Sequence, residues 1–240
     1  MSSSRPGRAF RRLLITLVVL ALLLVVVDRA AAYVAENQLA SMAEKEAAQY
    51  DVRAADTSVH IGGFGFLPQL VKEDFSKVTL TMKQPTFSGI PAEDLKVDLT
   101  DVHVPKALLT GDRGAAVTVD STALRLQLAP AELAKLAARS TGLSGLTMAV
   151  VDDKLHAKLS LRGINADVTI VPKVSKGRIV LVVDQLSDSI PSFIRSAVKN
   201  QLARGIVIPK LPFGAQLDQV SVEGSSVLLT ASAADLKFNT

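Results

Sequence analysis

An uninterrupted run of uncharged, almost wholly apolar residues extends from Leu13 to Val27 and constrains this chain more than any other stretch. Four arginines precede the run, and an Asp-Arg pair follows it. As a helix the run rises about 22 Å, which is shorter than the ~30 Å hydrocarbon core of a bilayer. Residues 28–48 contain no Gly or Pro, so the same helix can continue beyond the run. We therefore predict that residues 13–32 form a membrane anchor or a signal segment.

Two localisations follow from this segment. The arginines before it predict that residues 1–12 are a basic cytoplasmic tail, because positive charge stays on the cytoplasmic side. Residues 33–240 then form a single exported domain on the extracytoplasmic, periplasmic side of the cell membrane. The Ala-x-Ala pattern that ends at Ala32 leaves an alternative, a protein secreted after signal cleavage near that residue.

The formal net charge of +4 does not indicate a nucleic-acid-binding protein. The chain has 27 Lys and Arg against 23 Asp and Glu, and four of its arginines precede the apolar run. Residues 28–240 therefore carry 23 charges of each sign and lack the cationic surplus that binds nucleic acid. Cysteine is absent, which excludes thiol catalysis and thiolate metal sites.

Period-two alternation of apolar and polar residues recurs along the exported part and predicts strands. It is clearest at 78–82 and 124–128, and within 95–104 its phase slips, which is typical of a β-bulge. Helical patterns with one apolar face occupy 131–140 and 191–203. Because the strands do not alternate regularly with helices, we predict an α+β fold with an antiparallel sheet.

The chemical motifs do not assemble a reaction centre. His60, His103 and His156 are widely separated polar-phase strand residues without metal-ligand spacing, so we assign no metal and no cofactor. Ser196-x-x-Lys199 matches a tetrapeptide of penicillin-recognising enzymes, but no Lys-Thr-Gly follows it. We therefore assign no catalytic residue and predict that the protein is not an enzyme.

The informative signal is instead apolar. Residues 62–70, too rich in Gly and Pro for a regular helix or strand, still carry several large apolar side chains. Such a segment packs against the core, lines the lip of an apolar cavity, or dips into the bilayer. The candidate lipid-binding residues are the apolar ones of this segment, of the 191–203 helix and of a later turn: Phe64, Phe66, Leu67, Leu70, Phe193, Ile194, Val198, Leu202, Leu211 and Phe213. Lys72 and Lys210 are candidate head-group contacts at the cavity rim.

Several motifs in order resemble one protein family. Asp28-Arg29 and Ala35-Glu36-Asn37-Gln38 follow the apolar run, Gly63-Phe64-Gly65-Phe66-Leu67 comes next, and Pro212-Phe213-Gly214 precedes the end. Together they resemble the LmeA-like family of actinobacterial cell-envelope proteins, over about residues 28–238. The family more often has Pro between the two Phe residues, where this chain has Gly65.

The resemblance implies a fold and a function. The fold is a curved antiparallel β-sheet wrapped around helices, similar to tubular lipid-binding domains. The function is binding of a phospholipid, of the phosphoinositide type or a related one, in support of envelope glycolipid and mannolipid assembly. The resemblance carries over no catalytic residue, because the family's motif positions are aromatic, Gly and Pro.

Three hypotheses remain open at this point. The leading one is a non-enzymatic protein that binds membrane lipid in an apolar cavity. The alternative is a structural scaffold that docks an envelope glycosyltransferase and has no lipid cavity. The third is an envelope hydrolase or transferase, which needs an acid–base pair among Asp152, Asp153, His156 and Ser196.

Overall fold

The computed structural model describes residues 6–49, 51–87, 89–109, 115–143, 145–161, 164–186, 190–208, 211 and 214–239. Its helices are α1 (Pro6–Gln49), α2 (Phe66–Lys72), α3 (Lys106–Leu109), α4 (Pro130–Thr141) and α5 (Ser192–Leu202). The strands up to the middle of the chain are β1 (Val52–Arg53), β2 (Asp56–Gly62), β3 (Asp74–Lys83), β4 (Thr86–Phe87), β5 (Ile90–Pro91), β6 (Asp94–His103) and β7 (Ala116–Leu128). The later strands are β8 (Thr147–Val151), β9 (Lys154–Leu161), β10 (Ile164–Ser175), β11 (Arg178–Leu186), β12 (Ile206–Val207), β13 (Gln216–Glu223) and β14 (Ser226–Asn239).

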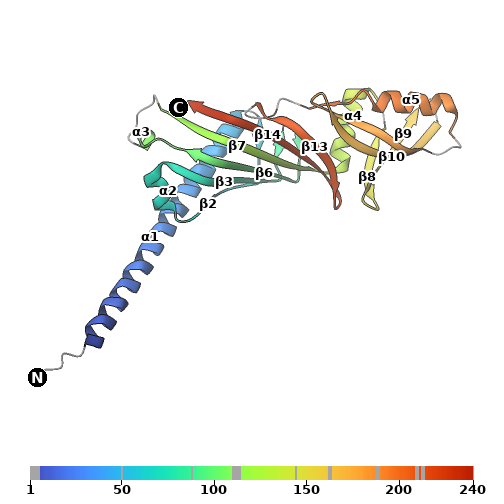
Figure 1. Cartoon of the computed structure of the whole chain (residues 1–240). Coiled ribbons are helices and arrows are strands. Elements are labelled where there is room, and N and C mark those ends of the chain that lie inside the picture. The colour runs from blue at the N-terminus through green and yellow to red at the C-terminus, as the bar shows by residue number, and fades with distance from the viewer. Residues whose placement is uncertain are drawn as a thin grey trace, which may run out of the picture.

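Two antiparallel sheets form the body of the molecule. A strongly curled half-barrel has the strand order β13-β14-β7-β6-β3-β2, and a five-stranded sheet has the order β12-β11-β10-β9-β8. They follow one another along an elongated body, and α1 projects from the end of the half-barrel that lies away from the five-stranded sheet (Figure 1). This arrangement confirms the predicted α+β class with a curved antiparallel sheet.

Helix α1 has two parts with different surroundings. From Leu14 to Val27 its large apolar side chains are 46–63% exposed, because this part stands clear of the domain. Beyond it, Ala32 is buried, and Ala35 and Ala47 pack against the buried face of the half-barrel, which we call the inner face. Alanine lets the helix axis approach the sheet closely. The helix thus continues unbroken from the apolar run into the domain, as its Gly- and Pro-free sequence predicts.

The predicted phase slip in β6 is part of a row that crosses the half-barrel. Ser76, Asp101, Asp120 and Asp235 occupy equivalent register positions on β3, β6, β7 and β14, and each is skipped by the strand pairing. Asp101 and Asp235 have a φ of 52°, a left-handed conformation that Asp tolerates better than most residues. Because all four strands skip a residue at the same level, the strands stay paired in the same register on both sides of the row. Along each strand, the side chains that point inward switch at this row from one set of alternate positions to the other.

The two predicted internal helices cover the five-stranded sheet. Helix α4 begins at Pro130, which is favourable in a first helical turn, and ends at Thr141, where Gly142 caps it with a φ of 73°. Helix α5 contributes Ile194, Val198 and Leu202 to the same core. The hairpin predicted at Asp152-Asp153 is confirmed between β8 and β9.

The prediction that residues 62–70 lack regular structure was wrong in its second half, since α2 begins at Phe66. Pro68 is tolerated there because the first turn of a helix leaves its N–H groups free of intrahelical bonds. The N-cap residue Gly65 has no side chain to accept those N–H groups. A residue distant in sequence, Asp28, accepts them instead.

Candidate lipid-binding site

An apolar cavity of about 100 Å³ lies where the half-barrel meets α4 and the five-stranded sheet. All of the side chains that line it are apolar: Phe87, Ile90, Leu95, Leu124, Leu126, Leu128, Leu136, Ile179, Ile208, Leu211, Leu217, Leu229 and Ala231. A cavity lined only by such groups offers water no hydrogen-bond partner and stays dry. Its chemistry suits a hydrocarbon chain.

Strand periodicity places these residues on one surface. On β7, every second residue from Leu124 to Leu128 faces the cavity. The partners of Leu126 and Leu124 on β14 are Leu229 and Ala231, which face it too. Leu136 of α4 and Ile179 of β11 close the far side.

The cavity is small for its proposed ligand. An enclosed apolar cavity of about 150 Å³ in another protein holds one benzene molecule. At about 100 Å³, this cavity holds only part of an acyl chain. Loading a whole chain therefore requires the cavity to widen.

A second hollow, of about 660 Å³, adjoins the cavity and is more open and more polar. It is lined by short or polar residues and one Leu: Ser121, Thr122, Ala123, Gly214, Gln216, Ser232, Ala233, Ala234 and Leu236. Thr122 pairs with Ala233, two residues along each strand from the pair of Leu124 and Ala231. The two hollows are therefore neighbours along β7 and β14.

Thr122 is a candidate site residue that the sequence reasoning missed. It is only 2% exposed, and its Oγ1 has no hydrogen-bond partner among the described residues. A buried hydroxyl without a partner is unfavourable, and a ligand's polar head group can supply the missing bond. The sequence does contain a signal, because Thr122 occupies the same alternating position as the apolar residues Leu124 and Leu126 that follow it.

The inner face is apolar from α2 to the cavity. Near α2 lies a cluster of Ile61, Phe75, Val102 and Val119. A second cluster follows, with Met82, Leu95, Val97, Leu124 and Ala231, and three of these also line the cavity. Leu99 packs against both clusters, so the apolar surface is continuous.

The predicted residues of the Gly-Phe segment lie at the α2 end of this face. Phe66 and Leu70 pack against the first cluster, and the rings of Phe66 and Phe75 have centroids 5.9 Å apart. Leu67 is half-buried, whereas Phe64 is 96% exposed. Lys72, at the end of α2, is exposed.

The other predicted residues are not brought together with these. Leu211 lines the cavity, at the opposite end of the inner face from Phe66. Three residues of α5 are buried in the core of the five-stranded sheet and do not line the cavity: Ile194, Val198 and Leu202. Phe193 is 58% exposed on the same helix. Lys210 and Phe213 lie outside the described residues.

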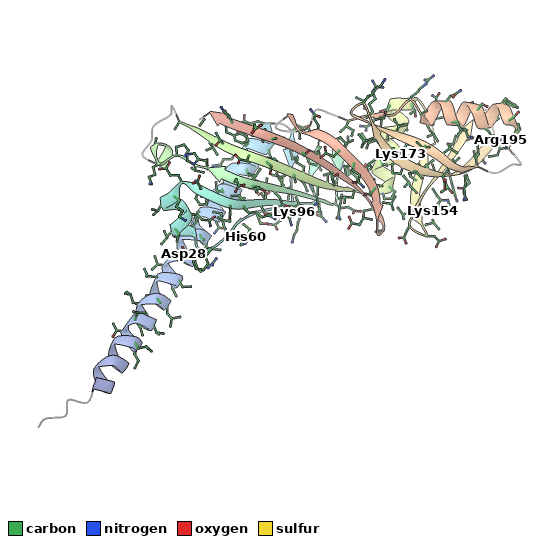
Figure 2. All side chains as sticks on the ribbon, viewed as in Figure 1. Asp28, His60, Lys96, Lys154, Lys173 and Arg195 are labelled. Atoms are coloured by element: carbon green, nitrogen blue, oxygen red, sulfur yellow. The ribbon has the colours of Figure 1, made fainter. Side chains whose placement is uncertain are left out.

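Helix α1 holds the Gly-Phe segment through Asp28. The Asp28 side chain is largely buried, its Oδ2 accepts a hydrogen bond from the Phe66 N–H (3.0 Å), and its Oδ1 accepts one from the Leu67 N–H (2.7 Å). One turn further into the domain than Ala32, Glu36 accepts a hydrogen bond from the Ile61 N–H at 2.7 Å. Figure 2 shows Asp28 where α1 leaves the body. Two carboxylates of one helix thus bind α2 and β2.

Gln69 fixes the shape of the loop. Its side-chain amide donates to the carbonyl oxygens of Gly62 (3.0 Å) and Gly65 (2.7 Å), and its Oε1 accepts from the Ser76 N–H (2.9 Å). Gly65 has a φ of 72°, which the proline ring excludes.

The titratable side chains are dispersed. His60, His103 and His156 each lie beside a different carboxylate, and no group of three metal-ligating side chains gathers among the described residues. Burial raises the pKa of Asp98, but hydrogen bonds from Thr79 and Lys77, together with the charges of Lys96 and Lys77, lower it by more, so the pKa lies below its ordinary value. Asp98 therefore stabilises the outer face of the half-barrel as a carboxylate.

Comparison with known proteins gives one match. A family model described as LmeA-like phospholipid-binding matches residues 26–232. No curated protein and no solved structure matches the chain. The matched range includes Asp28, all of the residues that line the cavity, and Thr122, but it ends before Ala233, Ala234 and Leu236 of the second hollow. The resemblance noted in the sequence is thereby confirmed: this chain belongs to the LmeA-like phospholipid-binding family.

Proposed function

We propose that this protein is a non-enzymatic phospholipid-binding protein that takes acyl chains into the apolar cavity. The observation that carries the proposal is the wholly apolar lining of that cavity at one end of a continuous apolar face. Transfer of hydrocarbon from water into such a site contributes roughly 0.8 kcal/mol per CH₂ group. One or two acyl chains therefore supply ample gross driving force once the cavity has widened.

The head group occupies the neighbouring hollow in this proposal. Its short and polar side chains leave room, and Thr122 offers a buried hydroxyl that lacks a partner among the described residues. A phosphoinositide-type head group, with several hydroxyls, suits hydrogen bonding to Thr122, Gln216 and Ser232. Support of envelope glycolipid assembly follows from the family resemblance, and docking of an envelope glycosyltransferase is the alternative hypothesis.

The proposal includes retention of the N-terminal helix as an anchor, with residues 1–12 cytoplasmic and the domain extracytoplasmic. Helix α1 is long and apolar enough from Leu14 onward to cross a membrane. Cleavage near Ala32 would remove Asp28 and leave the N–H groups of Phe66 and Leu67 without their acceptor. The folded domain thus uses a residue that a signal peptidase would discard, which supports an anchor over a secreted form.

The test is native mass spectrometry with lipid extraction on the full-length protein, purified from its own membranes in mild detergent. We expect stoichiometric phospholipid on the wild type and its loss from Ala231→Leu, which fills the cavity. A folded, lipid-free wild type would contradict lipid binding. A glycosyltransferase that co-purifies with such a lipid-free protein would favour the scaffold.

A further inference from the structure

Phe64 is the most exposed large hydrophobic side chain among the residues whose side chains the structure describes, with 96% of its surface accessible. It therefore contributes almost nothing to the core of the domain. An isolated exposed apolar residue is unremarkable on a flexible loop. Here, however, the backbone on both sides of Phe64 is held firmly.

Hydrogen bonds fix the residues that flank Phe64. Gln69 bonds the carbonyl oxygens of Gly62 and Gly65, and Asp28 accepts the N–H groups that follow. Gly63 has a φ of 97°, and a Cβ there would collide with the side chains of Gln69 and Ser76. The loop is thus built around a glycine and a buried amide in a way that leaves the Phe64 ring pointing out of the domain.

The position of this loop relates it to the apolar helix. Asp28 is the first charged residue after the Leu13–Val27 run, and it binds the first turn of α2 directly. Helix α2 consequently lies beside α1 at the level where the run ends (Figures 1 and 2). Where α1 leaves a bilayer, that level is the interface between hydrocarbon and water.

The outward side of α2 has the composition of an interfacial segment. Phe66 and Leu70 turn inward to the core, whereas Val71 is 67% exposed and Lys72 is exposed beside it. On α1, Tyr33 is also 67% exposed, and Tyr is enriched at membrane interfaces. Aromatic and aliphatic groups next to a cation suit a leaflet that has anionic head groups.

We propose that Phe64 and Val71 form a membrane-contact surface, which inserts into the interfacial region of the leaflet from which α1 emerges. This rests on the anchoring included in the proposed function. The occupant of the surface is the lipid bilayer itself, because the surface continues the membrane-spanning part of α1 through the Asp28 contacts. The contact holds the α2 end of the inner face against the source of the lipid.

The absence of Trp from the chain allows a direct test with single reporters. Phe64→Trp, Phe193→Trp and Leu20→Trp are each made in the full-length protein and reconstituted into vesicles of zwitterionic and anionic phospholipid. Phe193 is the matched control, since it is an exposed Phe on α5, in the part of the chain that covers the other sheet. Leu20 reports on the apolar run.

The readout is quenching of Trp emission by phospholipids brominated at defined acyl positions. We expect blue-shifted emission and strongest quenching from shallow bromines for Phe64→Trp, strongest quenching from deep bromines for Leu20→Trp, and no quenching for Phe193→Trp. Suppose that Leu20→Trp is quenched but Phe64→Trp is quenched no more than Phe193→Trp. That result would overturn the contact surface and leave the anchor intact. If Leu20→Trp also escapes quenching, the anchoring fails together with the contact surface.

Discussion

Filling the cavity should stabilise the protein and abolish lipid binding at the same time. Ala231 of β14 lines the cavity and is only 6% exposed. Its pairing partner on β7 is Leu124, which lines the cavity too. Ala231→Leu adds three carbon atoms at a place where about 100 Å³ is empty. The new side chain therefore enters existing space, which the acyl chain would otherwise occupy.

Two estimates of the size of this effect agree. At about 24 cal/mol per Å³, complete filling of a cavity of about 100 Å³ recovers at most ~2.4 kcal/mol. Three added carbons at roughly 0.8 kcal/mol each give a similar upper value. Imperfect fit reduces the gain, so we expect an increase of about 1–2 kcal/mol in the free energy of unfolding. For a chain of this size, that raises Tm by roughly 2–8 °C.

The assay compares thermal unfolding of delipidated full-length protein in one detergent, before and after phospholipid is added. Without lipid, Ala231→Leu should unfold at a higher temperature than wild type; with lipid, only wild type should gain, because binding stabilises the folded state alone. The matched control is Ala157→Leu, a fully buried position away from the cavity lining, where overpacking costs about 1–3 kcal/mol. If Ala231→Leu is destabilised like Ala157→Leu and still responds to lipid, the cavity assignment is wrong.

Three further predictions follow from single side chains. Asp28→Ala should speed amide hydrogen exchange in α2, whereas the exposed Glu44→Ala on the same helix should not; equal exchange in both would show that Asp28 does not hold α2. Thr122→Val should raise the unfolding free energy by about 1 kcal/mol, since it removes an unpartnered hydroxyl, and should weaken phospholipid retention in mass spectrometry; unchanged retention would exclude a head-group role. The pKa of Asp98 is lower in the folded state than in the unfolded state. The ionised Asp98 therefore contributes its full stabilisation of the folded protein above the pKa of the unfolded state, and this contribution is lost as the pH falls through the pKa of the folded state. Asp98→Asn should therefore flatten the acid limb of the stability curve below about pH 4, measured by thermal unfolding across pH, and an unaltered acid limb would refute it.

Features carried by local pattern were predictable. The unbroken helix from the apolar run into the domain follows from the lack of Gly and Pro, and the strands follow from alternation. The hairpin at Asp152-Asp153 follows from residues that tolerate positive φ, which are 50° and 56° in the structure. The change of phase in the apolar alternation near Asp101 of β6 was also visible in the sequence.

Features that depend on distant partners were not predictable in the same way. Helix α2 is short, and its capping carboxylate comes from Asp28, 38 residues before Phe66. The shared row of slips needs the register of four strands, although Asp101, Asp120 and Asp235 each interrupt an apolar series in the sequence. The cavity needs the meeting of two sheets and α4, so the sequence suggests that a cavity exists without locating its lining.

In the proposed function, the membrane-contact surface and the cavity lie at opposite ends of the inner face, and Leu99 links the two apolar clusters between them. Asp28 and Glu36 bind α1 to α2 and β2, so the half-barrel has a defined position relative to the apolar helix. An acyl chain that crossed water on its way to the cavity would expose its CH₂ groups, at a free-energy cost of roughly 0.8 kcal/mol for each group. The proposed route instead follows apolar groups such as Phe75, Leu99 and Leu124, and it requires the α1 residues that pack on this face, Ala35 and Ala47, to move aside. Leu99→Lys, which interrupts this surface between the two clusters, should therefore slow lipid loading from vesicles more than it lowers the affinity for lipid already bound.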